Sequence, residues 1–318
     1  MLLDHRRRSL GCDRYAQCPV IARRRRHLRD CLSAEHRDKH GDKNALFHLG
    51  GLKRCVVIAT DNAYCKCSPD LQPENRLISF IVPAYDEEIL LGATLDALHA
   101  VGKALNEPYE LVVADDASTD RTAAVAERHG AHVVRVAHRQ IAATRNSGAR
   151  AAVGELFIFV DADTIVSEAV VRAAVDVVRG GAVGGGASVA FDPEVPRYAK
   201  LLMPFLAWFS RTVGLAAGCF LFCSRDAFVA VGGFDETFFG AEEIVMSRAL
   251  RNHGRFVVLR EAVTTSGRKL RTHTGVEVLK IFVRMSLSGF QAVKQREGME
   301  LWYAERRPDP RISDQLGR

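Results

Sequence analysis

The feature that most constrains the fold is a regular alternation of short apolar runs with longer amphipathic runs in the first part of the chain after residue 76. Four apolar runs of five or six residues occur there, at residues 77–82, 109–114, 132–136 and 156–160. Runs of that length suit buried strands, and the segments between them have the period of amphipathic helices. Strands that alternate with helices predict a parallel sheet with helices on both faces.

The remaining elements are expected from the same patterns, with less regularity in the second half. Helices are predicted at residues 87–105, 120–129, 141–152, 168–179, 197–213, 242–252 and 276–295, with Ser167 near the start of the fourth. Further strands are predicted at residues 183–191, 219–223, 256–259 and 263–266.

The basic charge of the chain lies in its first 75 residues. That segment holds 15 Lys and Arg against 9 Asp and Glu, which accounts for the net charge of +6, and the rest holds 29 of each sign. Because the segment shows no helical or strand period, it is expected to be a disordered basic extension. Arginine binding to nucleic acid or acidic lipid, and zinc binding by Cys and His, are the alternatives. No paired CxxC occurs, which argues against zinc binding. No function is assigned to the segment, and no nucleic-acid partner is expected.

Cysteine usage and hydropathy bear on location. Only Cys219 and Cys223 lie beyond residue 75, which favours a reducing, cytoplasmic environment. The N-terminus runs into arginines without the apolar region of a secretory signal. The most apolar later stretch, residues 201–223, contains Pro204 and Arg211, which argues against a membrane span. A helix followed by a buried strand is expected there, and a helix lying on the inner face of the plasma membrane is the alternative.

Acidic residues follow three of the predicted strands. Open α/β sheets bind ligands at the carboxyl ends of their strands, so chemistry is expected in these loops. Asp161 and Asp163 end the fourth run, "LFIFVDADT", and can point to the same side because side chains alternate along a strand. Their mutual repulsion favours a cation between them, and hard oxygen ligands suit Mg²⁺ or Mn²⁺. A turn followed by a helix cap would use the same residues.

The loops after the first two strands have the residue types of a nucleoside site. Tyr85 could stack on a base, and Asp116 could accept a hydrogen bond from a base N–H. Arg145, in "RNSG", could meet a diphosphate, because its fork matches phosphate oxygens. Each has a plain structural alternative: a strand-to-helix turn for Tyr85, and an exposed surface position for Arg145. Glu242 and Glu243 open a predicted helix, where one carboxylate could accept a proton from an attacking hydroxyl.

Four segments in this order, "FIVPAYDEE", "VVADDASTDRT", "RNSGARAAVGELFIFVDADT" and "GGFDETFFGAEE", resemble the family-2 glycosyltransferases of the nucleotide-diphospho-sugar transferase superfamily. The resemblance covers roughly residues 77–260. It implies the α/β fold called GT-A: a Rossmann-like, mostly parallel sheet flanked by helices, here with a C-terminal helical tail. The chain would then divide into an extension at 1–75, a GT-A glycosyltransferase domain at 76–270, and a C-terminal helix and tail at 271–318.

The resemblance also implies roles for individual residues. Asp163 matches the metal-binding aspartate of the family's DxD motif, and Asp161 a contact to ribose or metal. Pro83, Tyr85, Glu88, Asp116 and Arg145 fall in segments that bind the nucleotide-sugar. Glu243 stands at the position of the catalytic base, which is usually Asp in the family, and Glu242 is the alternative base. His273 is a candidate third metal ligand, as a late histidine is in some GT-A enzymes.

The function expected from these motifs is an inverting, metal-dependent transfer of a single sugar from a nucleotide-diphosphate-sugar, with a UDP-sugar favoured, to an acceptor hydroxyl. The Gln-x-x-Arg-Trp element of processive synthases is absent, which favours a single transfer. Sugars, lipid-linked compounds and small molecules all remain open as acceptors. A nucleotidyltransferase is one rival, although it would carry a basic glycine-rich loop where "PAYDEE" stands. A non-catalytic protein that binds sugar nucleotides or a membrane surface is the other.

Overall fold

The computed structural model describes residues 77–193, 195–196, 216, 218–273, 277, 293–297, 299, 303 and 309. All of them lie in the compact unit Gln72–Arg318. Eight strands form one sheet in the order β3-β2-β1-β4-β7-β6-β8-β5. The strands are β1 (Ile78–Ala84), β2 (Tyr109–Asp116), β3 (His132–Val136), β4 (Leu156–Val160), β5 (Thr164–Ile165), β6 (Gly184–Phe191), β7 (Phe220–Ser224) and β8 (Phe256–Thr265).

The sheet is mixed. Strands β1 to β4 are parallel to one another, and β6 is parallel to β8. Strand β7 lies between β4 and β6 and is antiparallel to both. The alternation in the sequence predicted the parallel half correctly. It could not predict the direction of β7, because a short apolar run reads alike in parallel and antiparallel strands.

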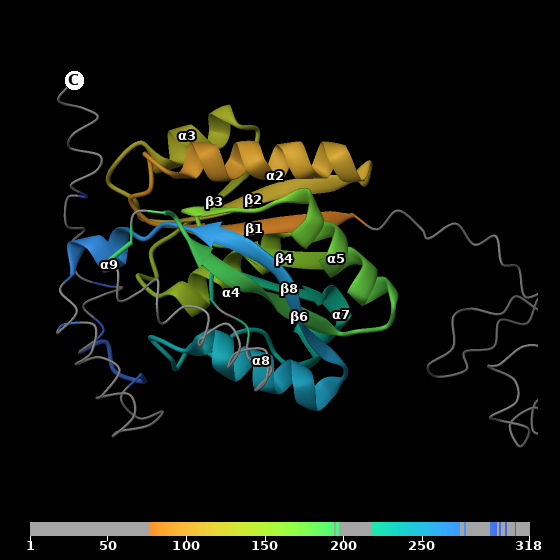
Figure 1. Ribbon diagram of the computed structural model, residues 1–318. Coiled ribbons are helices and arrows are strands. Elements are labelled where there is room, and N and C mark those ends of the chain that lie inside the picture. Colours follow the sequence, from red (N-terminus) through yellow and green to blue (C-terminus); the bar gives the residue numbers. More distant parts are fainter. Residues whose placement is uncertain are drawn as a thin grey trace, which may run out of the picture. The chain divides into compact units, whose positions relative to one another are not determined.

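Helices cover both faces of the sheet (Figure 1). They are α2 (Leu91–Leu105), α3 (Thr122–Arg128), α4 (Ile141–Ala151), α5 (Glu168–Arg179), α7 (Arg225–Ala230), α8 (Glu242–His253) and α9 (Arg268–Thr272). Apolar residues of α2, α3 and α5 pack with Phe80 and its neighbours on one face. Those of α4, α7 and α8 pack with Phe157 and Phe159 on the other. Alternate side chains of the buried strands therefore serve two cores.

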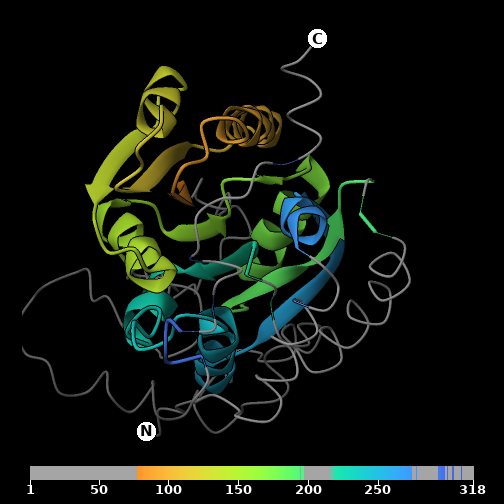
Figure 2. The same cartoon turned by 90° about the vertical axis from the view of Figure 1, so that its left-hand side faces the viewer.

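The carboxyl ends of β1, β2 and β4 meet at one edge of this layered structure, where α9 also lies. Figure 2 looks onto that edge, which is on the left in Figure 1. The register brings Ala84 beside Asp115 and pairs Phe80 with Ile158, so the loops that follow the three strands leave the sheet close together. The predicted ligand-binding edge is thus assembled by the parallel strands.

The glycine run of β6 has a steric cause. A Cβ at Gly185 would lie 2.0 Å from the carbonyl oxygen of Val257 and 2.5 Å from the ring of Phe222. Both neighbours are paired with Gly185 across the sheet. Only glycine therefore allows β7 and β8 to approach β6 from both sides at this position.

Several element boundaries differ from expectation. Helix α2 begins at Leu91 rather than at residue 87, because residues 85–90 form the loop at the ligand-binding edge. Strand β8 is continuous over ten residues where two shorter strands were predicted, and β5 and α7 were not predicted. Ser167 caps α5 by accepting from the backbone of Val170, as expected. The helices predicted at 197–213 and 276–295 lie outside the described residues, apart from single positions. Within the described part of the chain, no helix has the length and hydropathy needed to cross a membrane.

Candidate functional site

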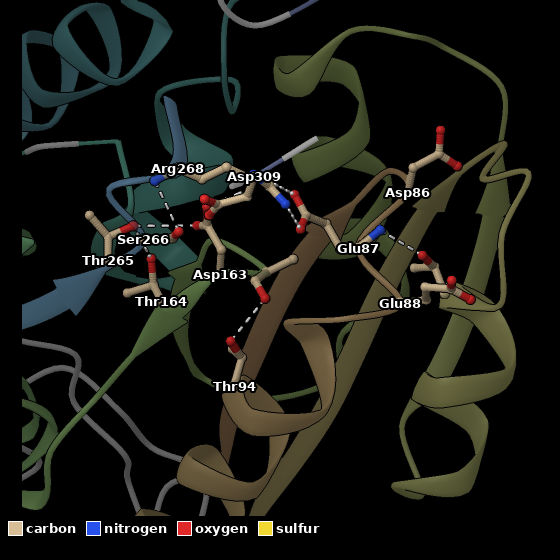
Figure 3. A network of polar contacts seen from close by, with 12 residues as sticks. Asp86, Glu87, Glu88, Thr94, Asp163, Thr164, Thr265, Ser266, Arg268 and Asp309 are labelled. Carbon is tan, nitrogen blue, oxygen red and sulfur yellow. Dashed lines mark hydrogen bonds and ion pairs between the residues drawn. The ribbon is translucent and has the colours of Figure 1, made fainter. Parts of the chain in front are cut away.

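Asp163 lies in a polar network at the end of β4 (Figure 3). Thr265 donates a hydrogen bond to its Oδ1 at 3.3 Å, and Nη2 of Arg268 lies 3.9 Å from Oδ2. Burial, followed by the negative charge of Glu87, raises the pKa of Asp163 to about 6. A carboxylate of this kind gains from any additional cation that enters the site.

Glu87 and Arg268 form a buried ion pair beside Asp163. The guanidinium donates to both carboxylate oxygens of Glu87, at 3.1 and 2.7 Å. Arg268 begins α9, whereas Glu87 follows β1, so the pair ties two ends of the site together. Glu88 was predicted to lie in the nucleotide-sugar site, whereas Glu87 was not. Glu88 instead joins the first two loops, since its carboxylate accepts from the backbone and side chain of Arg121.

The backbone of the Asp161–Asp163 turn is fixed from three directions. Thr94 of α2 donates from its hydroxyl to the carbonyl of Ala162 at 2.9 Å. The amide of Asp161 donates to the carbonyl of Cys219, and the amide of Ser266 donates to the carbonyl of Asp163. The two carboxylates are therefore held at the sheet edge by contacts that do not use their own oxygens.

Arg145 is a buried cation at the centre of the second half of the site. Only 2% of its side chain is exposed. Nη2 donates to Oδ1 of Asp161 and to the carbonyl of Gly218, both at 2.8 Å, and Nη1 donates to Oε1 of Glu242 at 2.6 Å. Among the described residues, its Nε has no hydrogen-bond partner. The predicted diphosphate-binding arginine is thus engaged with carboxylates of the chain.

The two glutamates at the start of α8 differ in environment. Glu242 is buried and receives the guanidinium of Arg145. Glu243 is partly buried, and a Cβ added to Gly218 would lie 3.4 Å from its carboxyl carbon. Burial, followed by the charge of Glu242, raises the pKa of Glu243 to about 8, although the charge of Arg145 opposes the shift.

Tyr85 and Pro83 lie at the end of β1, as expected. Pro83 is a buried strand residue beside Ala114 of β2. The guanidinium carbon of Arg139 lies 3.5 Å from the centre of the Tyr85 ring, a cation–π contact. One face of the predicted stacking residue is therefore covered by an arginine, which the sequence did not indicate.

Asp116, which was expected to contact a base N–H, and its neighbour Asp115 have different hydrogen-bond partners. Asp116 is the more heavily bonded: its carboxylate accepts from the amides of His138, Arg139 and Gln140 and from the hydroxyl of Thr144. These bonds organise the turn that leads into α4. Asp115, in contrast, accepts from the Ser118 amide at 3.4 Å, through Oδ1. Asp115 is therefore a further candidate for contact with a base N–H, and Asp116 has the contacts of a structural residue.

Four non-glycine residues in the loops of this edge have positive φ. They are Asp86 after β1, Ala117 after β2, Arg139 before α4 and Ala241 before α8, with φ between 46° and 59°. Left-handed backbone is costly for a residue with a side chain, and it concentrates at functional sites. The four turns therefore support the assignment of this edge as the site.

His273 ends α9 and is tied to its own helix, with Nδ1 3.1 Å from the carbonyl of Lys269. Among the described residues, no three or more His, Cys, Asp or Glu side chains are grouped so that they could hold a metal ion by themselves. Mg²⁺ and Mn²⁺ typically take one or two carboxylates and complete their coordination with substrate phosphates. Asp163, whose partly buried carboxylate keeps a raised pKa of about 6 despite the charges of Lys269 and Arg268, fits a site of that kind.

Asn146, which follows Arg145 in "RNSG", is a site residue whose role was not predicted from the sequence. Its side-chain amide donates to the carbonyl of Phe234 and to the carboxylate of Glu236, and its oxygen accepts from the amide of Phe234. Arg145 and Asn146 of α4 thus bind the first turn of α8 and the loop that precedes it. Its signal in the sequence is the pairing of "RNSG" with "GGFDE" far downstream.

Residues 79–228 match the family model described as glycosyl transferase family 2. The validoxylamine A glucosyltransferase of Streptomyces hygroscopicus subsp. jinggangensis is 27% identical over 248 residues, which are 62% of this chain and 57% of the relative. The undecaprenyl-phosphate 4-deoxy-4-formamido-L-arabinose transferase of Serratia proteamaculans is 35% identical over 100 residues, 28% of this chain and 29% of the relative. The chain spans just over half the length of the first of these curated relatives.

The solved structures show the same fold. The mannosyltransferase PcManGT from Pyrobaculum calidifontis, determined in complex with GDP-Man and Mn²⁺, superimposes with a TM-score of 0.52 at 20% identity. The match covers 70% of this chain and 65% of the other. The expected GT-A architecture, an open α/β sheet flanked by helices, is thereby confirmed.

Proposed function

We propose that this chain transfers a single sugar from a nucleotide-diphosphate-sugar to an acceptor hydroxyl, with inversion at the anomeric carbon and dependence on a divalent metal. The match of residues 79–228 to the glycosyl transferase family 2 model supports the proposal. The observation that carries the proposal is the bridge made by Arg145. One guanidinium binds Asp161, on the donor side, and Glu242, beside the candidate base. Donor and acceptor groups would therefore meet within the reach of a single side chain.

The donor would lie across the ends of β1, β2 and β4. Tyr85 and Asp115 would contact its base, and Pro83 and Glu88 support the same loops. The charge of Arg139, stacked on Tyr85, suits the carbonyl oxygens of a uracil, so a UDP-sugar is proposed and a GDP-sugar is the alternative. The related fold that was solved with GDP-Man belongs to another protein, and at 20% identity it supports the fold alone.

Asp163 would hold the metal, with Asp161 and His273 as further candidate ligands. When bound, Mg²⁺ or Mn²⁺ would neutralise charge on the leaving diphosphate. The chain's own contribution is to keep Asp163 in place, through Thr265 and through the backbone bonds of the Asp161–Asp163 turn.

Glu243 is proposed as the base and Glu242 as its fixed neighbour. A base works best when its pKa lies near the working pH, and Glu243 has a pKa of about 8. This favours a hydroxyl acceptor, which must lose a proton, over a phosphate, which is already ionised near neutral pH. The names of the relatives include both an undecaprenyl-phosphate transferase and a validoxylamine glucosyltransferase, so an acceptor on a lipid at the inner membrane face remains the second candidate.

The experiment is a screen of UDP-sugars and GDP-sugars for hydrolysis and transfer, with and without Mn²⁺. Asp163→Ala and Glu243→Gln should each abolish transfer, while the circular dichroism spectrum of each variant stays unchanged. Glu243→Gln should also bind the nucleotide as the wild type does. Asp235→Asn, in an exposed turn, is the matched control and should retain activity. Full activity in both site variants would overturn the assignment. Release of a sugar 1-phosphate, with transfer of the nucleoside monophosphate, instead of release of a nucleoside diphosphate would favour a nucleotidyltransferase. Binding without turnover would favour the non-catalytic rival.

A further inference from the structure

The arginine at the centre of the site has more partners than a single binding role requires. Arg145 belongs to α4, and its three acceptors come from three other segments: the turn after β4, the segment before β7 and the first turn of α8. The ring of Phe234 lies 5.4 Å from its guanidinium carbon. The side chain is thus immobilised where donor-side and acceptor-side segments converge.

Such a bridge requires the fork of an arginine. Nη1 and Nη2 each reach a different carboxylate, at 2.6 and 2.8 Å, from one planar group. An ammonium is a point charge on a flexible stem, so a lysine here could approach one carboxylate but would not fix the two relative to each other. The geometry therefore selects for arginine on grounds separate from phosphate binding.

Arg145 contacts the two glutamates of α8 differently. Glu242 is bound to Arg145 directly, and no hydrogen bond joins Arg145 to Glu243 in the described structure. The groups whose charges act on Glu243 are Glu242 on the same helix, Arg145 on α4 and Asp161 after β4, together with the backbone at Glu243 itself. Glu242 is thus the carboxylate that the guanidinium holds, beside the group that is proposed to take the proton.

We propose that Arg145 is a positioning residue that holds Asp161 and Glu242 in fixed relation, so that Glu242 stays bound to the guanidinium and Glu243 alone acts as the base. The inference rests on the proposed glycosyl transfer and goes beyond it by assigning the guanidinium to the protein's own carboxylates. Arg145 does not touch substrate in this assignment. Its effect reaches the reaction through the charge and position of Glu243.

The two members of the bridge have opposite electrostatic effects on Glu243. The charge of Glu242 raises its pKa, whereas the charge of Arg145 lowers it. Glu242→Gln should therefore move the acidic limb of kcat/KM to lower pH, and Arg145→Gln should move it to higher pH, each by about one pH unit or more. Loss of packing alone would lower the rate without moving the limb in opposite directions.

The test measures kcat/KM against pH for the wild type, Glu242→Gln, Arg145→Gln and Arg145→Lys, with Arg179→Gln as control. Arg179 is the last residue of α5, away from the site, and makes a partly buried ion pair with Glu107. Infrared titration of the Glu243 carboxyl, identified by its loss in Glu243→Gln, gives the same shifts without turnover and serves if a variant is inactive. Should Arg145→Gln fail to fold, Arg145→Lys keeps the charge and is expected to lower kcat more than it raises the KM of the donor.

Opposite shifts for Glu242→Gln and Arg145→Gln, with no shift for Arg179→Gln, are the expected result. Shifts in the same direction, or no shift, would overturn the inference while wild-type transfer still stood. Complete loss of transfer in Glu242→Gln with an unchanged Glu243 titration would instead make Glu242 the base. An inactive wild type would count against the proposed function. The infrared titration would then test by itself whether Arg145 and Glu242 shift the pKa of Glu243 in opposite directions.

Discussion

Arg268 and Glu87, which are 181 positions apart in the sequence, form a bidentate ion pair next to Asp163. Only 11% of the Arg268 side chain and 6% of the Glu87 side chain are exposed. The site thus contains two buried arginines, Arg145 and Arg268, each bound to a carboxylate beside the Asp161–Asp163 turn. The repulsion that the two aspartates would otherwise exert is offset by the chain's own cations.

Removing the second of these arginines should destabilise the fold. In Arg268→Gln, Glu87 loses both guanidinium hydrogen bonds while it remains buried near Asp163. Breaking a buried pair from one side costs about 3 kcal/mol or more in the free energy of unfolding. Urea denaturation at pH 7 measures the loss. The matched control is Arg172→Gln, which removes an exposed i,i+4 pair with Glu168 and should cost less than about 1 kcal/mol. Equal losses in the two variants would contradict the prediction.

The stability of the protein should depend on pH through Asp163. Its pKa is raised to about 6 in the folded protein from 3.8, so the folded state holds a proton that the unfolded state has lost between these values. The stabilisation is therefore complete below about pH 4 and disappears as pH rises through 6, which makes ionised Asp163 destabilising at neutral pH. A shift of two pKa units corresponds to about 3 kcal/mol.

Asp163→Asn removes this titration with little change in shape. The variant should resemble the wild type in stability at pH 4 and exceed it at pH 7.5, by up to about 3 kcal/mol. Thermal and urea unfolding at the two pH values give the difference, and Asp176→Asn, on the exposed face of α5, is the control. A variant that is less stable than the wild type by the same amount at both pH values would show that the hydrogen bond from Thr265 matters more than the charge.

The parallel direction of the first four strands, and the sheet edge at which the candidate site lies, were predictable from the sequence. Apolar runs such as 156–160 mark buried strands because of their length, and the alternation with helices fixes which ends of the first four strands coincide. Since acids follow three of those ends, the site edge could be identified without coordinates. The direction of β7 could not, because it depends on how the chain returns to the sheet after residue 193.

The partners of individual charges were not predictable. Arg145 and Glu242 are 97 positions apart, and which acid an arginine meets depends on how helices pack across the sheet. The choice between neighbours has the same origin. Asp115 and Asp116, or Glu87 and Glu88, are equivalent in composition, but they point in different directions at the end of a strand. Local sequence contains no record of that orientation.

Asp115 and Asp116 provide a direct test of this difference. Asp116→Asn replaces one of two oxygens that accept four hydrogen bonds and should lower the free energy of unfolding by about 2 kcal/mol. Asp115→Asn affects one long hydrogen bond and should leave stability nearly unchanged, while weakening UDP binding roughly tenfold through the lost charged acceptor. Urea unfolding and calorimetry with UDP and Mn²⁺ measure the two effects. The opposite pattern, with Asp116→Asn stable and unable to bind UDP, would restore Asp116 as the base contact.

Thr94 tests whether the Asp161–Asp163 turn, the proposed metal site, depends on a hydrogen bond from α2. Its hydroxyl, fully buried in α2, donates to the carbonyl of Ala162 between the two aspartates. Thr94→Val keeps the shape but leaves that carbonyl without its donor, at a cost of about 1–3 kcal/mol. The turn should loosen, so metal-dependent transfer should fall in parallel with stability. Thr94→Ser retains the hydroxyl and should recover most of both losses. If the serine and valine variants are impaired equally, the lost methyl packing rather than the hydrogen bond controls the position of Asp161 and Asp163.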